Sequence, residues 1–463
     1  MENNTDTSIS ILFAGGARKV TGSNFLVEAR RGEVVTRILV DCGLTQGGRF
    51  CESENNEPFP YDAKEVDAVF VTHAHADHIG LLPKLVKDGY TKKVYTTKAT
   101  ADLIPVMLSD AVSLIAREAA QCDSVPPYAK EDVENLIAHL EPVAYKEVIS
   151  VREGITATLY NAGHILRSAL VLLDVWGTHI LFTGDLGRTP ALLTDDPEIP
   201  EGVDYLITES VYGNRTHEPV ESSEKALKNA VQYVEKTGGT LLIPSFSLER
   251  TQIILSVLDR FFEEGVEPLP VFLDSPLATR VTEVYARNPD FLRSEFQTEL
   301  QKGNDPFSFK NLRVTYTKED SQEIEEAQGA KVIIAGAGMS HGGRVRNHEK
   351  KYLPDPNNML LLVGYQTPGS LGRRLQDGAK EVTIDRKKVS VRAKVAKVGG
   401  FSAHADRDDL VAFAEKVNPK QVFVVLGEME SASFLAQRIS GFLGIKTYIP
   451  QKGERIELEN LGT

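Results

Sequence analysis

The sequence predicts an α/β protein of more than one domain, because short apolar runs alternate with amphipathic stretches over a long chain. Its 463 residues exceed what one hydrophobic core usually serves. Hydrophobic residues make up 41% and charged residues 25%, a composition typical of globular proteins. Several apolar runs close on a Gly- or Asp-containing turn. This pattern is typical of buried strands whose carboxyl ends carry polar side chains.

Four such strands are predicted in the N-terminal half of the chain. They are RILVDCGL (37–44), DAVFVTHAH (67–75), HILFTGDLG (179–187) and DYLITES (204–210). Amphipathic periodicity predicts helices between and after them. These helices are expected at 78–88, 101–120, 130–139, 222–237, 249–263 and 408–417.

A second α/β block begins near residue 211. Three segments there read as a strand, a Gly- or Ser-rich turn and a helix: 238–262, 330–348 and 357–374. Such turns present backbone N–H groups and helix N-termini, which favour anions. Residues 331–398 hold 14 Lys or Arg against 5 Asp or Glu, although the whole chain has a net charge of −13. This basic segment in an acidic chain indicates a local polyanion site, with a solvated basic surface as the alternative.

The stretch THAHADH places four metal-binding side chains within six positions. They are His73, His75, Asp77 and His78. Zn²⁺ takes imidazole nitrogen and carboxylate oxygen, usually from about four ligands. Two sets of ligands on one loop suggest two adjacent ions. His164, in a Gly turn, and Asp185, at a strand tip, are further candidates, although each by itself would more often be structural.

These motifs together resemble the metallo-β-lactamase fold. The features that carry the resemblance are VDCG (40–43), THAHADH (72–78), GH (163–164) and TGD (183–185). Further stretches resemble the β-CASP branch: ITESVYGNR (207–215), IPSFSLERTQ (243–252), GMSHGGRV (338–345), the stretch 363–382 and GGFSAHADRDDL (399–410). Within it the chain is most similar to nucleases of the cleavage-and-polyadenylation type and their bacterial and archaeal relatives, over residues 8–458.

The resemblance implies a four-layer αββα sandwich with an inserted α/β β-CASP domain. The metallo-β-lactamase domain is expected at 1–208 and 386–463, and the β-CASP domain at 209–385. A cleft between them would admit single-stranded RNA and hinder a rigid duplex.

The resemblance also implies the roles of individual residues. His73, His75 and His164 should bind one zinc ion, and Asp185 should bridge to a second ion that Asp77 and His78 also bind. A water activated between the ions would be the nucleophile. Asp41 should orient a histidine ligand, and Glu209 should hold His404, which protonates the leaving oxygen. The residues expected to take part in catalysis are Asp77, Asp185, Glu209 and His404.

Phosphates of the substrate are expected at the glycine turns of the second block. The residues expected to contact them are Ser245, Arg250, Ser340, Gly343, Arg344, Arg374 and Ser402. His341 and His348 flank the basic glycine turn and are open to the same use.

The chain departs from the family pattern at Leu426. RNA-processing members carry there a His, in a VHGE stretch, that completes the second metal site, whereas this chain has VVLGE. The prediction is a zinc-dependent ribonuclease acting on single-stranded RNA, endonucleolytic or also 5′-to-3′ exonucleolytic, whose second site is weak or empty. The alternatives are an Artemis-like DNA nuclease and an RNA-binding subunit with weakened activity.

The cytoplasm is the expected compartment. The N-terminus lacks a secretory pattern, no run of about 18 apolar residues predicts a membrane span, and the three cysteines form no CxxC pair. These cysteines argue against a disulfide framework and for a reducing compartment. No membrane partner is expected, and a homodimer through the catalytic domain is compatible with the sequence.

Overall fold

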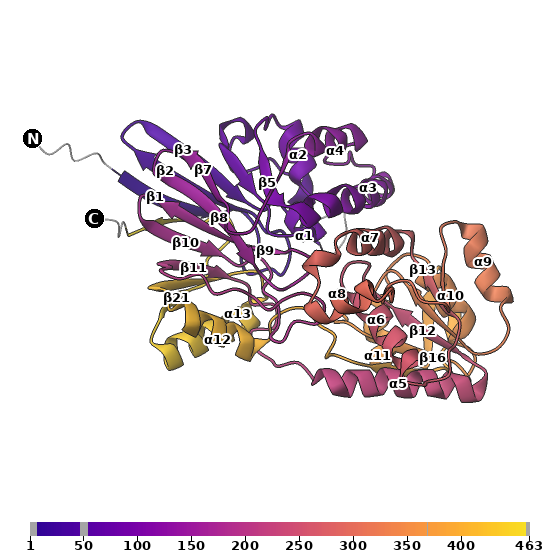
Figure 1. Cartoon of the computed structure of the whole chain (residues 1–463). Coiled ribbons are helices and arrows are strands. Elements are labelled where there is room, and N and C mark those ends of the chain that lie inside the picture. The colour runs from indigo at the N-terminus through magenta and orange to yellow at the C-terminus, as the bar shows by residue number, and fades with distance from the viewer. Residues whose placement is uncertain (1–6, 47–53, 368, 460–463) are drawn as a thin grey trace, which may run out of the picture. The chain divides into compact units, whose positions relative to one another are not determined.

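The computed structural model describes residues 7–46, 54–367 and 369–459. The chain divides into two compact units. Unit 1 comprises residues 1–216 and 404–463, and unit 2 comprises residues 217–403. Figure 1 shows helices and strands in both.

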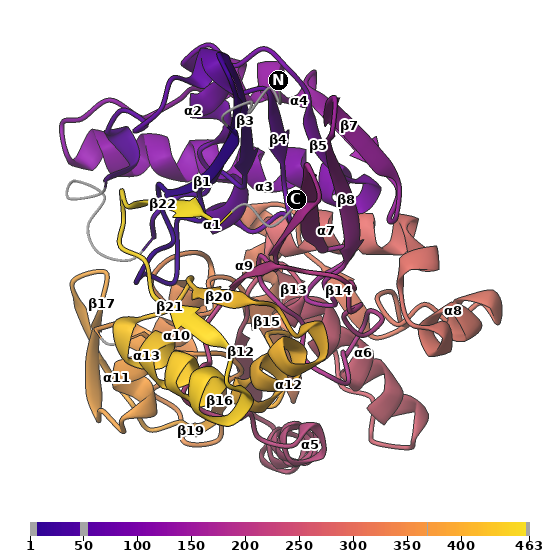
Figure 2. The same cartoon turned by 90° about the vertical axis from the view of Figure 1, so that its left-hand side faces the viewer.

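Unit 1 contains two seven-stranded sheets. The first sheet has the spatial order β22 (Arg455–Leu458), β1 (Thr7–Phe13), β2 (Phe25–Arg31), β3 (Val34–Val40), β4 (Ala68–Phe70), β5 (Val94–Thr97), β6 (Leu140–Val143). The second has the order β21 (Lys446–Tyr448), β20 (Gln421–Val424), β11 (Tyr205–Thr208), β10 (Thr178–Phe182), β9 (Ala169–Val175), β8 (Ile155–Asn161), β7 (Val148–Arg152). Figure 2 shows yellow β22 beside indigo β1, so both ends of the chain contribute to the first sheet.

The core of unit 1 lies between these sheets. Alternate residues of β8 are buried, and Ile155, Ala157 and Leu159 share one cluster with Ile11 and Val27 of the first sheet. This period of two is expected of a strand with one face on a core. A second cluster joins the outer face of the second sheet to α12 (Arg407–Val417) and α13 (Met429–Arg438).

Helices also lie beside the first sheet. They are α1 (Ala76–Ile79), α2 (Leu82–Lys87), α3 (Lys98–Gln121) and α4 (Lys130–Ile137). In Figure 1, α2, α3 and α4 lie next to the first sheet, and α12 and α13 next to the second. The predicted four-layer αββα sandwich is thereby confirmed. Two helices stand where a single one was expected at 78–88, since α1 ends at Ile79 and α2 begins at Leu82.

Helix α3 is the one helix among the described residues that is long and apolar enough to cross a membrane. Its most apolar window has a mean hydropathy of 1.5, and 39% of it is buried. A core helix of a folded unit meets the same criterion. This feature is weak evidence for a membrane, and the expectation of no membrane partner stays a prediction.

Unit 2 is built on a six-stranded sheet in which every strand pair is parallel. Its order is β14 (Leu312–Val314), β13 (Val271–Asp274), β15 (Lys331–Ala335), β12 (Thr240–Pro244), β16 (Met359–Leu362), β19 (Lys394–Lys397). Its helices are α5 (Val220–Thr237), α6 (Arg250–Glu263), α7 (Pro276–Arg287), α8 (Ser294–Gln301), α9 (Lys318–Glu326), α10 (Val345–Tyr352) and α11 (Leu371–Gln376). Every residue of β12 and β15 is buried, as expected for central strands of a parallel sheet. The three strand-turn-helix segments expected here are β12–α6, β15–α10 and β16–α11.

The unit boundaries differ from those expected at 208 and 385. Residues 386–403 lie in unit 2, because β19 pairs with β16 and because β18 (Lys387–Ser390) pairs with β17 (Glu381–Ile384). Residues 209–216 lie in unit 1, where Ser210 donates to the carbonyl of Val425.

Two of the three cysteines lie within the described residues. Cys42 is free and buried, and burial raises the pKa of its thiol. Cys122 is disulfide-bonded, so the argument from reduced cysteines is wrong for this residue. The cytoplasmic compartment stays a prediction. Cys51 lies outside the described residues.

Candidate metal centre

The polar residues that follow the strands of unit 1 gather at the carboxyl ends of those strands. Strands β3 and β4 are parallel neighbours in the first sheet, and Asp41 and His73 follow them. Strands β10 and β11 are parallel neighbours in the second, and Asp185 and Glu209 follow them. His164 stands in the turn between β8 and β9.

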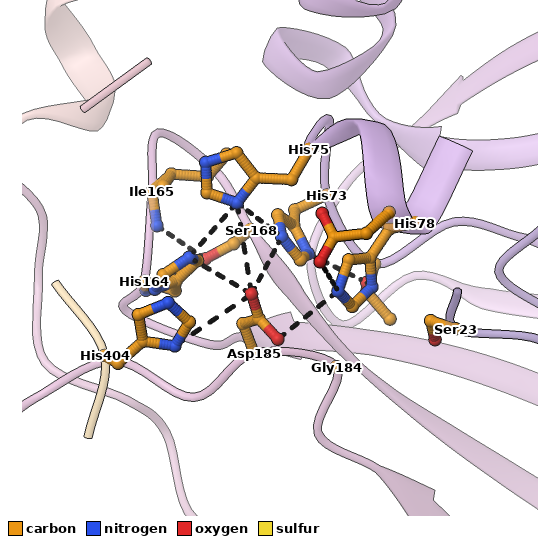
Figure 3. A network of polar contacts seen from close by, with 12 residues as sticks. Ser23, His73, His75, His78, His164, Ile165, Ser168, Gly184, Asp185 and His404 are labelled. Carbon is orange, nitrogen blue, oxygen red and sulfur yellow. Dashed lines mark hydrogen bonds and ion pairs between the residues drawn. The ribbon is translucent and has the colours of Figure 1, made fainter. Parts of the chain in front are cut away.

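Four side chains form a compact cluster: His73, His75, His164 and Asp185. One ligand atom from each lies within 4.8 Å of all the others. Asp185 Oδ2 is 3.4 Å from His73 Nε2, 3.9 Å from His75 Nδ1 and 3.5 Å from His164 Nε2. Figure 3 shows these imidazoles pointing toward Asp185. The structure therefore brings together the residues that the sequence assigned to the first ion.

His78 approaches Asp185 from another side. Its Nε2 lies 3.3 Å from Asp185 Oδ1 and 4.0 Å from Asp77 Oδ2. Its Nδ1 lies 2.7 Å from Asp41 Oδ2, which places the Nδ1 proton in that hydrogen bond. Asp41 thus orients a histidine of the centre, as expected, and that histidine is His78.

Two residues that the sequence did not single out support Asp41. Thr72 donates its backbone N–H to Asp41 Oδ1 over 2.8 Å, and the Ser23 hydroxyl donates to Oδ2 over 2.9 Å. Gly184 has a φ of 53°, and a Cβ there would lie 2.6 Å from Thr72 Oγ1. The glycine of the TGD motif therefore leaves space for Thr72, which donates a hydrogen bond to Asp41. A hydroxyl before His73 is the signal that could have found Thr72.

The backbone of His164 is also held by a hydroxyl. Ser168 Oγ accepts from the N–H groups of His164 and Ile165, over 3.0 and 3.2 Å (Figure 3). This serine, four residues after the histidine, is a further residue that motif reading missed.

Burial sets the protonation of the centre. It lowers the pKa of His73, His75 and His164, which favours the neutral imidazole that a metal requires. Burial would also lower the pKa of His78, but the carboxylates of Asp185 and Asp41 outweigh it and hold that pKa well above its usual value.

The residues present fit a metal cation. Three imidazole nitrogens and a carboxylate oxygen are a donor set that Zn²⁺ takes. His78 Nε2 is buried and makes no hydrogen bond with the described residues. Since Nδ1 carries the proton toward Asp41, the Nε2 lone pair would face the Asp185 carboxylate across 3.3 Å. Two acceptors at that distance repel each other unless a proton or a metal ion lies between them. The carboxylates that raise the pKa of His78 would likewise stabilise a cation at this place.

Glu209 and His404 form a second pair beside Asp185. Glu209 Oε1 lies 3.2 Å from His404 Nδ1 and accepts from the N–H of Leu186 over 2.7 Å. Burial would lower the pKa of His404, but Glu209 and Asp185 raise it to about 9. Burial raises the pKa of Glu209. The geometry brings these residues within 4.8 Å of Asp185, and their catalytic roles stay predictions.

Leu426 is buried at 1% exposure in the core between the sheets, with a φ of 47°. A Cβ at Gly16 would lie 2.8 Å from Leu426 Cδ2 and 3.3 Å from the Cα of Ser23. Leu426 and Ser23 therefore both lie close to Gly16, and the leucine side chain carries no donor atom.

The seven residues expected to bind phosphate lie in unit 2, after the carboxyl ends of β12, β15, β16 and β19. Ser245, Ser340 and Ser402 are buried, whereas Gly343 and Arg374 are exposed. Arg250 donates to the carbonyl of Val363. Phosphate binding by these residues stays a prediction.

Arg344 and His348 are held by Asp274, which the sequence analysis missed. Asp274 is fully buried, and its oxygens lie 2.6 Å from Arg344 Nη1 and 2.6 Å from His348 Nε2. His348 is 1% exposed and paired with Asp274, so it is not available for the contact with phosphate that the sequence left open. The signal was an Asp at a strand end in FLDSP, the same signal that marked Asp185.

Three family models match the chain. The metallo-β-lactamase superfamily model matches residues 20–245, and the Beta-Casp domain model matches 251–375. A model described as a Zn-dependent metallo-hydrolase RNA specificity domain matches 388–450.

Curated relatives match over nearly the whole chain. Ribonuclease TTHA0252 from Thermus thermophilus is 36% identical over 97% of both chains. An RNase J-like protein from Methanocaldococcus jannaschii is 33% identical over 96% of this chain and 99% of its own. Transcription termination factor FttA from Methanosarcina mazei is 33% identical over 96% of this chain and 70% of its own.

A solved structure of a protein of unknown function from Enterococcus faecalis V583 has the same fold. Its TM-score is 0.58 at 14% identity, covering 97% of this chain and all of that one.

Proposed function

The chain belongs to the metallo-β-lactamase superfamily and, within it, to the β-CASP nucleases, and on that premise we propose that it is a zinc-dependent ribonuclease acting on single-stranded RNA. The observation that carries the proposal is the cluster of His73, His75, His164 and Asp185 with the Glu209–His404 pair beside it. The RNA specificity model over 388–450 and the ribonuclease relatives support RNA as the substrate.

His73, His75, His164 and Asp185 would hold one zinc ion. A bound zinc ion supplies a Lewis acid that lowers the pKa of water toward neutrality. Asp77 and His78 would hold a second ion together with Asp185, and Asp41 keeps His78 Nε2 available by accepting the Nδ1 proton. A histidine ligand oriented in this way is the usual arrangement in zinc sites.

Glu209 and His404 would act on the leaving oxygen. Glu209 holds the Nδ1–H of His404 and stabilises the imidazolium, whose pKa is raised to about 9. A protonated His404 can donate from Nε2 as the phosphodiester bond breaks, and such general acid catalysis contributes about 10²- to 10⁴-fold. Glu209 itself is positioned by the N–H of Leu186.

Cleavage of a 5′-labelled single-stranded RNA by the full chain, with added zinc and with a chelator, tests the proposal. We expect Asp185→Asn and His73→Ala to lower the rate at least about 100-fold, because each removes a ligand. His139→Ala is the matched control, since this ring lies beside Tyr90, outside the cluster. Cleavage that continues in the chelator would refute the mechanism.

One observation favours a second candidate function. Leu426 stands where the RNA-processing members carry a His, and this departure is the observation behind the Artemis-like DNA nuclease as the alternative. RNA and DNA of the same sequence, compared under identical zinc, separate the two functions. Clearly faster cleavage of the DNA would identify DNA as the substrate in place of RNA. Binding without cleavage of either nucleic acid would favour the third alternative, an RNA-binding subunit with weakened activity.

A further inference from the structure

Unit 2 displays two aromatic side chains at the carboxyl edge of its parallel sheet. Phe246 follows β12 and is 38% exposed, and Tyr365 follows β16 and is 37% exposed. The two strands are hydrogen-bonded neighbours, so both residues leave the sheet at the same edge. Leu248, in the same turn as Phe246, is 3% exposed. The turn therefore buries its leucine and presents its phenylalanine.

Two glycines hold the ring of Phe246 in place. A Cβ at Gly338 would lie 2.8 Å from Phe246 Cδ2, and a Cβ at Gly364 would lie 3.1 Å from Cε2. Gly338 follows β15 and Gly364 follows β16, the two strands on either side of β12. The ring thus lies against bare backbone from both neighbouring loops.

Gln366 ties these two loops together. Its side-chain N–H₂ donates to the carbonyls of Gly338 and Gly364, over 3.0 and 3.1 Å, and the residue is 1% exposed. Thr251 Oγ1 of α6 donates to the carbonyl of Phe246 over 2.7 Å. Backbone and ring are therefore both held before any ligand arrives, which reduces the conformational entropy that binding would cost.

Positive charge lies beside this ring. A Cβ at Gly364 would be 3.6 Å from Arg250 Nη1 and 3.1 Å from Phe246 Cε2, which places one guanidinium group close to the ring. Aromatic faces beside basic groups are how proteins bind single-stranded nucleic acid, because every base can stack and every linkage carries negative charge.

We propose that Phe246, held by Gly338, Gly364 and Gln366, is a stacking platform for one unpaired base of the substrate. The inference rests on the proposed function, which identifies the nucleic acid as single-stranded RNA. It goes beyond the expected phosphate contacts by placing a base against unit 2. Since a base paired in a duplex cannot offer its face, the platform selects unpaired strands.

Binding of a 5′-fluorescein adenosine octanucleotide to the full chain tests this proposal. Fluorescence anisotropy is measured in a chelator, so that no cleavage competes. We expect Phe246→Leu to weaken binding at least about fivefold and Phe246→Tyr to bind as the unmodified chain does, because a base–aromatic stack is lost only in the first. Phe434→Leu is the matched control, since Phe434 is also 38% exposed but lies on α13 of unit 1.

Octanucleotides with one abasic position supply a readout that altered folding would not reproduce. In a series of octanucleotides with the abasic site at successive positions, one member should bind the unmodified chain more weakly, by the same factor as the Phe246→Leu substitution. The same member should bind the Phe246→Leu chain as tightly as the intact octanucleotide does. The platform would be overturned if Phe246→Leu bound the octanucleotide as the unmodified chain does, or if Phe434→Leu weakened binding equally. It would also be overturned if abasic sites and Phe246→Leu lowered the affinity independently at every position, or if the unmodified chain did not bind.

The two proposals fail separately. If the unmodified chain cleaves RNA and Phe246→Leu binds equally well, the platform is wrong and the ribonuclease stands. If the abasic coupling is present and RNA is not cleaved, the platform stands and the ribonuclease is wrong.

Discussion

Asp41 has a left-handed backbone, with a φ of 59°, and is 1% exposed. Such a conformation costs a non-glycine residue about 1–3 kcal/mol and persists where the surroundings hold it. Here Ser23, Thr72 and His78 all bond to its carboxylate. The strain is therefore located at the residue that fixes which nitrogen of His78 faces Asp185.

Asp41→Asn tests this role. The amide keeps the size of the side chain but leaves one oxygen to accept from Ser23, Thr72 and His78, so His78 is no longer held in one tautomer. We expect the zinc affinity to fall about 10- to 100-fold, measured by competition with a chelator. Asp67→Asn, which alters surface contacts with Lys92 and Arg37, is the control. Equal affinities in Asp41→Asn and Asp67→Asn would contradict the role.

Leu426→His should supply a donor atom at the position where the family pattern has a metal-binding His. We expect zinc content per chain and turnover both to rise, with affinity at the second site increasing about tenfold or more. Histidine also tolerates a positive φ better than leucine does, so the backbone conformation at 47° should accept it. Metal analysis and rates measured at limiting zinc check the prediction. Equal stoichiometry and equal rates in the two proteins would refute it.

Helix α10 buries two ionisable side chains together with two apolar or aromatic ones. Val345, His348, Glu349 and Tyr352 are buried at helical spacing. His348 is paired with Asp274, whereas burial raises the pKa of Glu349 to about 7. The helix therefore places an acid that resists ionisation in the core of unit 2.

Glu349→Gln should change how stability depends on pH. Because the pKa rises from 4.5 to about 7 on folding, the contribution of Glu349 is complete below pH 4.5 and is lost as the pH rises toward 7. The loss amounts to about 3 kcal/mol at most. Urea unfolding between pH 4.5 and 8 should show the unmodified chain losing stability relative to Glu349→Gln. Glu381→Gln is the control and should follow the unmodified chain, since Glu381 is exposed on β17. Parallel curves for all three proteins would refute the account.

The whole molecule combines a metal-binding unit with a unit built on a parallel sheet. All the metal candidates lie in unit 1, including His404, although the chain passes through unit 2 between Glu209 and His404. The loops of unit 2 that follow β12, β15 and β16 carry Phe246, Gly338, Gly364 and Gln366.

Zinc should therefore stabilise unit 1 selectively. A ligand at 100 times its dissociation constant stabilises the folded state by about 2.7 kcal/mol. Amide hydrogen exchange with and without zinc should show added protection in β3, β4 and β10, and none in β12 or β15. Asp185→Asn should remove the effect. Equal protection of both units, or protection that persists in Asp185→Asn, would contradict a zinc site confined to unit 1.

Much of the fold and the site was predictable because the signals are local. A run of apolar residues followed by Asp or His predicts a strand and the polar residue at its end, as for β3 with Asp41 and β10 with Asp185. The strand-turn-helix segments of unit 2 were predictable for the same reason. The sequence alone thus determined the fold class, the metal candidates and the departure at Leu426.

The tertiary structure decided which of these groups meet. Ser23 lies in none of the motifs and Thr72 is only the first residue of THAHADH, but both matter because β2, β3 and β4 bring them to Asp41. Arg344 was expected to contact phosphate, and only the structure shows that it also pairs with Asp274, 70 positions away. Residues 386–403 change unit because β19 pairs with β16. The physical reason is common to all three observations. Hydrogen bonds and ion pairs depend on distances in space, and the pairing of strands that are distant in sequence sets those distances. This pairing cannot be read from the local periodicity of the sequence.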